Sequence, residues 1–155
     1  MTSRTVLILI VVLAFLGIAD AWYLAQSALS DTPLVCDING LSNCNVVAQS
    51  PYSHLFGVPL ALYGVFFYGL LFVLAALALW VSRPLIARGL TALGVVGLLA
   101  SIAFLGIQLF LIKAVCLYCL ASAVISFLLF IFTLVHGKQS RVPVVREWEV
   151  TRVET

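Results

Sequence analysis

The stretch 114-AVCLYCLASAVISFLLF-130 decides how the rest of the chain is interpreted. Continued to Val135, it is apolar and long enough to cross a bilayer as a helix, because a helix rises about 1.5 Å per residue and the hydrocarbon core is about 30 Å thick. Its first residues include Cys116 and Cys119, a CxxC pair. Cysteines three residues apart at a helix start share one face, which suits a disulfide or a reactive dithiol. The stretch therefore places a candidate redox pair at the rim of a membrane helix.

The whole chain has the composition of a membrane protein. Of its 155 residues, 64% are hydrophobic and only 9% are charged, whereas soluble domains are about half apolar and a quarter charged. The net charge of +2, with no basic cluster, gives no sign of nucleic-acid binding. Inside lipid, every backbone group needs a partner within the segment, so apolar spans form helices. We predict an all-α bundle of four transmembrane helices, at roughly Thr5–Leu29, Val58–Val81, Gly89–Ile112 and Ala114–Val135.

Basic residues predict the orientation of these spans. Lys113 alone lies between the third and fourth spans. The other basic residues precede the first span, separate the second from the third, or follow the fourth: Arg4, Arg83, Arg88, Lys138, Arg141, Arg146 and Arg152. The positive-inside rule then puts both termini in the cytoplasm and the loop Ser30–Phe56 outside. All four cysteines fall on the outer, oxidising side.

The chain is expected to hold one membrane domain, 1–136, whose outer loop caps the bundle between the first two spans, and a short cytoplasmic tail, 137–155, at the membrane surface or mobile. A cleaved signal peptide is the alternative for the N-terminus, since "ADA" at Ala19–Ala21 resembles a cleavage site. The apolar run continues to Leu29, which favours a full span.

A second pair of cysteines, Cys36 and Cys44, lies eight residues apart in the outer loop. A mobile dithiol beside a helix-anchored dithiol is the layout of an electron relay. Three other interpretations stay open: a four-cysteine zinc site, two structural disulfides, and cysteines that only fill space. Two pairs on one membrane face favour redox chemistry, and we predict no metal site.

The segment 36-CDINGLSNCNVVAQSPYSHLFGVPLALYG-64, followed by CLYC at the head of the last span, resembles the vitamin K epoxide reductase family. The likeness covers about residues 20–135 and is nearer to the bacterial branch, which reoxidises thioredoxin-like disulfide donors. It rests on four features together: the loop cysteine pair, a serine six residues after the second cysteine, the run F-G-x-P, and CxxC at the fourth span.

The resemblance implies a role for each matched residue. Cys36 receives electrons from a partner, and Cys44 passes them to the membrane pair. Cys116 is the cysteine that Cys44 attacks, while Cys119 faces a quinone. The remaining catalytic residue is Ser50, which hydrogen-bonds near the quinone carbonyl.

The resemblance also implies a quinone as electron acceptor and cofactor, of menaquinone, ubiquinone or vitamin K type, and a separate thioredoxin-fold (DsbA-like) partner. It places the protein in the bacterial inner (plasma) membrane. Animal members carry Asn at the position of Leu60 and Tyr at the position of Ala123, so a plain quinone fits better here than vitamin K epoxide. Among the aromatic residues near the second span, Tyr63 is our candidate for lining the quinone site.

Two other classes of function stay open. A transporter or channel subunit could have four spans, but Asp20 is the only Asp, Glu, Lys, Arg or His residue inside them. A scaffold that anchors a partner could use the cysteines as structural disulfides. Asp20 and His54 have no assigned role.

Overall fold

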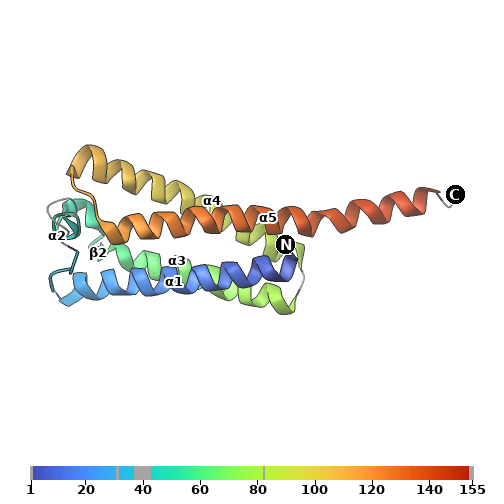
Figure 1. Ribbon diagram of the computed structural model, residues 1–155, viewed down its shortest axis with the longest axis horizontal. Coiled ribbons are helices and arrows are strands. Elements are labelled where there is room, and N and C mark those ends of the chain that lie inside the picture. The colour runs from blue at the N-terminus through green and yellow to red at the C-terminus, as the bar shows by residue number, and fades with distance from the viewer. Residues whose placement is uncertain (1, 31, 37–42, 82, 154–155) are drawn as a thin grey trace.

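Four long helices run side by side in the computed structural model, which describes residues 2–30, 32–36, 43–81 and 83–153 (Figure 1). A π-helical segment, η2 (Ile107–Ile112), continues the third of them. The helices are α1 (Ser3–Ser30), α3 (Leu60–Trp80), α4 (Pro84–Gly106) and α5 (Leu117–Val153). Each contains a stretch long and apolar enough to cross a membrane, so the predicted four-helix bundle is confirmed.

The second and third spans begin elsewhere than predicted. Val58 and Pro59 form a short strand, β2, and α3 begins only at Leu60. Pro84 begins α4, five residues before Gly89. Proline suits a first helical position because its φ is already helical and its missing N–H would have no partner there.

The last helix also differs from the prediction. It begins at Leu117 rather than Ala114, because Cys116 occupies the cap position described below. It continues beyond Val135 to Val153, so the helix includes most of the predicted tail 137–155. Lys, Gln, Arg and Glu, which are good helix formers, make up seven of residues 136–153, and the same stretch also contains Gly137 and Pro143. The cytoplasmic location of 137–155 stays a prediction.

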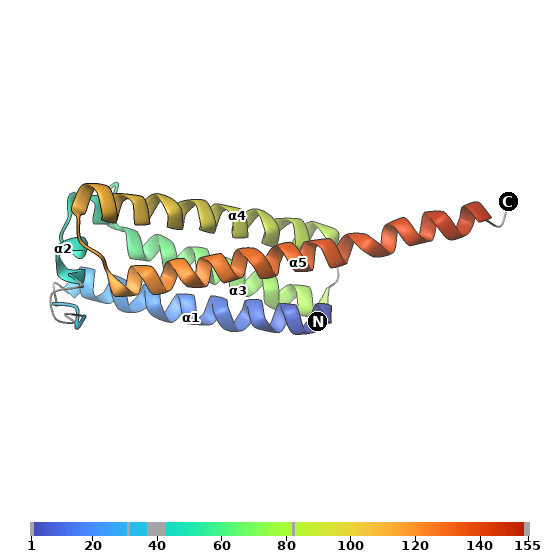
Figure 2. The same cartoon turned by 45° about the horizontal axis from the view of Figure 1, so that its top comes forward.

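The bundle has two distinct ends. The N-terminus, the connection from α3 to α4 and the extension of α5 lie at one end (Figures 1 and 2). At the other end, which we call the cap end, lie the segment after α1, the short helix α2 (Cys44–Ala48) and the connection from η2 to α5. α1 packs against α3 and α5, and α4 packs against the same two helices. All four cysteines therefore belong to the cap end.

Small residues allow the helices to approach closely. A Cβ at Gly17 would lie 2.6 Å from the Tyr68 ring, and a Cβ at Gly97 would lie 2.6 Å from the Phe67 ring. At Gly94, an added Cβ would collide with the Thr133 hydroxyl. Gly94 and Gly97 thus allow close helix packing.

The F-G-x-P run forms a hairpin at the cap end. Strand β1 (His54–Leu55) follows the 3₁₀ turn η1 (Pro51–Ser53) and pairs antiparallel with β2 (Val58–Pro59). Phe56 and Gly57 both have positive φ, 53° and 79°, the backbone geometry that matches the twist of paired strands. The hairpin leads the chain directly into α3.

Candidate functional site

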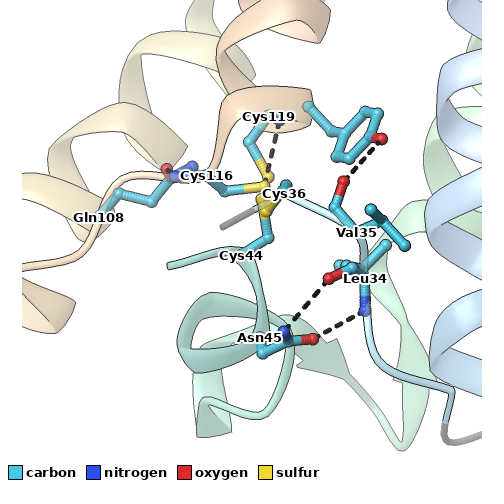
Figure 3. The surroundings of a disulfide bond; sticks show 9 residues. Leu34, Val35, Cys36, Cys44, Asn45, Gln108, Cys116 and Cys119 are labelled. Atoms are coloured by element: carbon cyan, nitrogen blue, oxygen red, sulfur yellow. Dashed lines mark hydrogen bonds between the residues drawn. A yellow bond between two sulfur atoms is a disulfide. The ribbon is translucent and has the colours of Figure 1, made fainter. Parts of the chain in front are cut away.

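A side-chain clamp holds the segment before Cys36 against α2. The backbone N–H of Leu34 donates to Asn45 Oδ1 at 2.8 Å, and Asn45 Nδ2 donates to the Leu34 carbonyl at 3.3 Å (Figure 3). Because α2 begins at Cys44, this pair of bonds joins the two stretches that carry the loop cysteines. The sequence alone does not single out Asn45 for this role.

Two further hydrogen bonds tie the same region to the head of α5. The Tyr118 hydroxyl donates to the Val35 carbonyl at 3.3 Å, and the backbone N–H of Asn43 donates to the Val115 carbonyl at 3.1 Å. Tyr118 also packs against Tyr23 of α1, with ring centroids 5.0 Å apart. The loop cysteines are therefore held beside the CxxC motif.

The four cysteines gather in one buried cluster. Cys36 and Cys44 form a disulfide with Cα atoms 6.1 Å apart, and Cys116 and Cys119 are free thiols. Cys36, Cys44 and Cys116 are at most 5% exposed and share a hydrophobic cluster, against which Cys119 packs. Figure 3 shows their sulfur atoms turned toward one another. Thiol–disulfide exchange needs a thiolate beside a disulfide sulfur, and this cluster supplies that arrangement.

The zinc alternative finds no support in the arrangement of these cysteines. Cys36 and Cys44 are joined to each other instead of presenting two thiolate ligands. In the part of the chain that the structure describes, no three His, Cys, Asp or Glu side chains form a group suited to a metal ion.

Cys116 caps helix α5. The Leu120 N–H bonds to its carbonyl at 3.0 Å, and the Cys119 N–H donates to its sulfur at 3.3 Å. Its pKa is lowered from 9.0 to about 7. The largest cause is a hydrogen bond from the Cys119 thiol, to which the backbone N–H groups of Cys119 and Tyr118 add, while burial opposes the shift. A negative charge at a helix N-terminus is also favoured by the helix dipole.

Gln108 orients the same cysteine. It is 4% exposed, and its Oε1 accepts the backbone N–H of Cys116 at 3.0 Å. Its own carbonyl accepts the N–H of Ala114 at 3.3 Å. Lys113, between them, has a left-handed backbone with φ 56°. The turn from η2 to α5 is thus organised around one amide, which sequence analysis missed although an amide within an apolar span is a visible signal.

A cavity of about 320 Å³ opens beside the cluster. Its wall includes Cys44, Cys116 and Cys119, as well as the predicted residues Ser50 and Tyr63. Most other lining residues are apolar, from α1, α3, α4 and α5. The volume is within the range of small-molecule sites. The structure thus brings five of the six predicted site residues to one cavity wall, and the sixth, Cys36, is joined to Cys44 by the disulfide.

Ser50 and Tyr63 bond to the local backbone in this conformation. The Ser50 hydroxyl donates to the Val47 carbonyl at 2.8 Å, and the Tyr63 hydroxyl donates to the Leu55 carbonyl at 3.2 Å. His54 lies on the exposed hairpin and pairs with the Ser53 hydroxyl at 2.9 Å. Ser50 and Tyr63 line the cavity wall and His54 does not, and the roles of Ser50 and Tyr63 toward a ligand stay predictions.

A hydroxyl cluster, also missed from the sequence, lies further along the cavity. The Tyr68 hydroxyl is within 2.7 Å of Ser122 Oγ and 2.9 Å of Ser126 Oγ. All three residues line the cavity. Asp20 does not, and its Oδ2 is buried without a hydrogen-bond partner among the described residues.

A comparison with known protein families identifies the family of this chain. The model of the vitamin K epoxide reductase family matches residues 8–134. The chain belongs to this family. A comparison with curated proteins found no match. Family membership, the four apolar helices and the Cys36–Cys44 disulfide make the chain a multi-pass membrane oxidoreductase of the thiol–disulfide type.

Proposed function

We propose that this vitamin K epoxide reductase family member oxidises the dithiol of a separate thioredoxin-fold protein and passes the two electrons to a membrane quinone. One observation carries the proposal: a disulfide and a dithiol meet in a buried cluster that opens onto an apolar cavity. Cysteines that serve only as structural disulfides do not need to reach an apolar cavity.

The first exchange involves the loop pair. A thiolate of the reduced partner attacks Cys36, and the Cys36–Cys44 bond breaks to release Cys44 as a thiolate. The partner's second thiolate then attacks its own mixed disulfide, so that the partner leaves oxidised and Cys36 is a thiol. Two electrons have entered the chain.

The second exchange transfers these electrons to the helix pair. Cys44 attacks Cys116 of a Cys116–Cys119 disulfide and releases Cys119 as a thiolate. Cys36 then attacks Cys44, which restores the loop disulfide and frees Cys116. The product has the loop pair oxidised and the helix pair reduced, which is the redox state that the structure describes.

The cavity fits the head group of a quinone by size and by lining. Its wall is largely apolar and carries both thiols of the helix pair, with hydroxyls at several points. A bound quinone supplies a two-electron acceptor that takes up two protons. Re-forming the Cys116–Cys119 bond releases two electrons and two protons, so the exchange balances. The lowered pKa of Cys116 makes its thiolate available near neutral pH.

Cycling of the cysteines tests the proposal. Purified protein, mixed with a reduced thioredoxin-fold donor and a soluble quinone analogue, should reduce the quinone, and thiol trapping should catch each pair in both redox states. A serine substitution at any of the four cysteines should abolish turnover. Cysteines that never change state would favour the transporter or scaffold alternatives.

We also propose that the cap end faces outward, because Arg83 and Arg88 lie toward the opposite end and Lys113 at the cap end. Phe56, at the hairpin tip, is 93% exposed and suits labelling after substitution by cysteine. An impermeant maleimide on intact cells should label Phe56→Cys but reach Arg83→Cys only after lysis. The reverse pattern would invert the orientation.

A further inference from the structure

The Tyr68 hydroxyl is surrounded by oxygen atoms in an otherwise apolar part of the bundle. It lies 2.7 Å from Ser122 Oγ, 2.9 Å from Ser126 Oγ and 3.0 Å from the Ser122 carbonyl. Tyr68 is 3% exposed and Ser126 is 4% exposed. Ser122 is half-buried. Buried hydroxyls are expensive unless they are hydrogen-bonded, so this group of three hydroxyls between α3 and α5 is a distinct feature of the bundle.

The cluster belongs to the same cavity as the thiols but lies deeper. Ser122 and Ser126 follow Cys119 by three and seven residues, so they share its face of α5. A rise of about 1.5 Å per residue puts them about 4.5 Å and about 10 Å further along the helix axis. All of these residues line the cavity. A molecule lying in the cavity would therefore have the thiols at one end and the hydroxyls at the other.

The position of Tyr68 is fixed by its neighbours. A Cβ on Gly17 would come within 2.6 Å of the ring, so α1 holds one side of it. The ring of Phe67 lies edge-on, with centroids 5.3 Å apart. The hydroxyl is thus held in place before any ligand enters.

The cluster can offer a proton to a ligand without coming apart. Tyr68, Ser122 and Ser126 carry three hydroxyl protons, and the Ser122 carbonyl and the hydroxyl oxygens can accept them. Hydroxyl protons rotate to suit their partners. One of them can turn into the cavity while the other two keep the cluster joined.

The cavity wall also has apolar positions on α3 and α5. Leu60 and Ala123 both line the cavity, and neither side chain can form a hydrogen bond. Ser50 and Tyr63 lie at the cap end of the wall, where their hydroxyls bond to backbone carbonyls. The Tyr68 cluster therefore supplies hydroxyls at the inner end, and Ser101 of α4 is a further hydroxyl residue of the wall.

We propose that Tyr68, together with Ser122 and Ser126, binds the quinone carbonyl oxygen that points away from the thiols. The proposal rests on the quinone-reducing function proposed above. A hydrogen bond at this oxygen orients the ring toward Cys119 and strengthens as electrons arrive, because bonds to a charged acceptor are stronger than bonds to a neutral one.

The test uses purified full-length protein with ubiquinone-1 and, separately, menadione, each labelled with ¹³C at the carbonyls. Tyr68→Phe keeps the ring and removes one hydroxyl, and Ser122→Ala with Ser126→Ala removes the other two. We expect Tyr68→Phe to raise the Kd of the quinone about three- to tenfold, to lower kcat about tenfold, and to return one carbonyl infrared band to the frequency of an unbonded carbonyl.

Two controls separate this binding role from general damage. Thr91→Val removes a membrane hydroxyl that bonds to the Ala87 and Thr133 carbonyls, at 3.0 and 3.2 Å, and does not line the cavity. It should leave Kd and the infrared bands unchanged. The rate at which a reduced donor loads the helix pair, followed by thiol trapping, should be the same in wild type and Tyr68→Phe.

The outcomes distinguish the two proposals. If wild type reduces quinone while Tyr68→Phe and the double serine variant show wild-type Kd and carbonyl bands, the assignment of the cluster is wrong and the proposed function stands. If wild type binds neither quinone, both proposals fail.

Discussion

The backbone N–H of Cys119 donates a hydrogen bond to the Cys116 sulfur, 3.3 Å away, so the first cysteine of the CxxC motif caps the helix that carries the second. Capping oxygens of Ser, Thr, Asp or Asn usually fill this position. A sulfur there gains the helix N-terminus as a partner, and its charged form gains most. The cap therefore links the start of α5 directly to the reactivity of the motif.

The position of Cys116 at the helix cap predicts how its alkylation depends on pH. The pKa of Cys116 is lowered to about 7, so its thiolate should predominate above that pH and be lost as the pH falls below it. With the loop disulfide intact, the rate of iodoacetamide alkylation at Cys116 should rise through a midpoint near pH 7. Cys119→Ala removes the largest cause of the shift and should move the midpoint upward. An identical midpoint in both proteins would show that the hydrogen bond from Cys119 does not matter.

Gln108 should prove essential for the geometry of the motif. Gln108→Leu leaves the buried N–H of Cys116 without its acceptor, which typically costs about 1–3 kcal/mol. We expect a lower thermal midpoint and slower transfer from Cys44 to Cys116, measured by rapid thiol trapping. Leu109→Val, at a 56% exposed neighbour on the same turn, is the control. Equal transfer rates in wild type and Gln108→Leu would contradict this role.

The four membrane spans could be predicted because the hydropathy of a segment follows directly from its own amino-acid residues. Their bounds could not, since the hairpin at Val58 and the sulfur cap at Cys116 arise from local hydrogen bonds. The cysteines and Ser50 were visible through motif spacing, and Tyr63 through the group of aromatic residues near the second span. Tyr68 was not singled out, because an apolar run does not show which face of a helix meets the cavity. The Gln108 amide stands out in the sequence, but nothing there indicates its bond to Cys116.

Asn45 should control how firmly the loop pair stays docked. Asn45→Ala removes both bonds to Leu34, each typically worth about 0.5–1.5 kcal/mol. Limited proteolysis near Leu34 should become faster, and electron transfer from the loop pair to the helix pair should become slower. Val46→Ala, at the exposed next residue, should change neither. Proteolysis at the wild-type rate in Asn45→Ala would show that other contacts hold the segment.

Ser50→Ala tests whether this hydroxyl acts on the quinone or only on the turn. If it leaves the Val47 carbonyl to hydrogen-bond at the redox centre, its loss should cost roughly 1.5–3 kcal/mol of transition-state stabilisation, about ten- to a hundredfold in quinone reduction. Loading of the helix pair by a reduced donor should be unaffected. Unchanged quinone reduction, with a slightly lower thermal midpoint, would assign Ser50 to the turn alone.

The order of the relay predicts a transient disulfide between Cys44 and Cys116. Both residues are at most 1% exposed in the same cluster, and both reach the cavity wall. Exchange requires one sulfur of each pair to bond while the others are free. In a Cys36→Ser, Cys119→Ser double variant, the two remaining thiols have no other partner among the four cysteines, so they should join and accumulate.

A protease site inserted between α3 and α4 makes this bond visible, because Cys44 and Cys116 then lie on different fragments. The fragments of the double variant should migrate together until a reductant is added. The complementary variant, Cys44→Ser with Cys116→Ser, keeps Cys36 and Cys119. It should link far less, since Cys36 does not line the cavity wall and Cys119 lies a turn beyond Cys116. Equal linkage in both variants, or none in the first, would mean that electrons enter the helix pair by a different route.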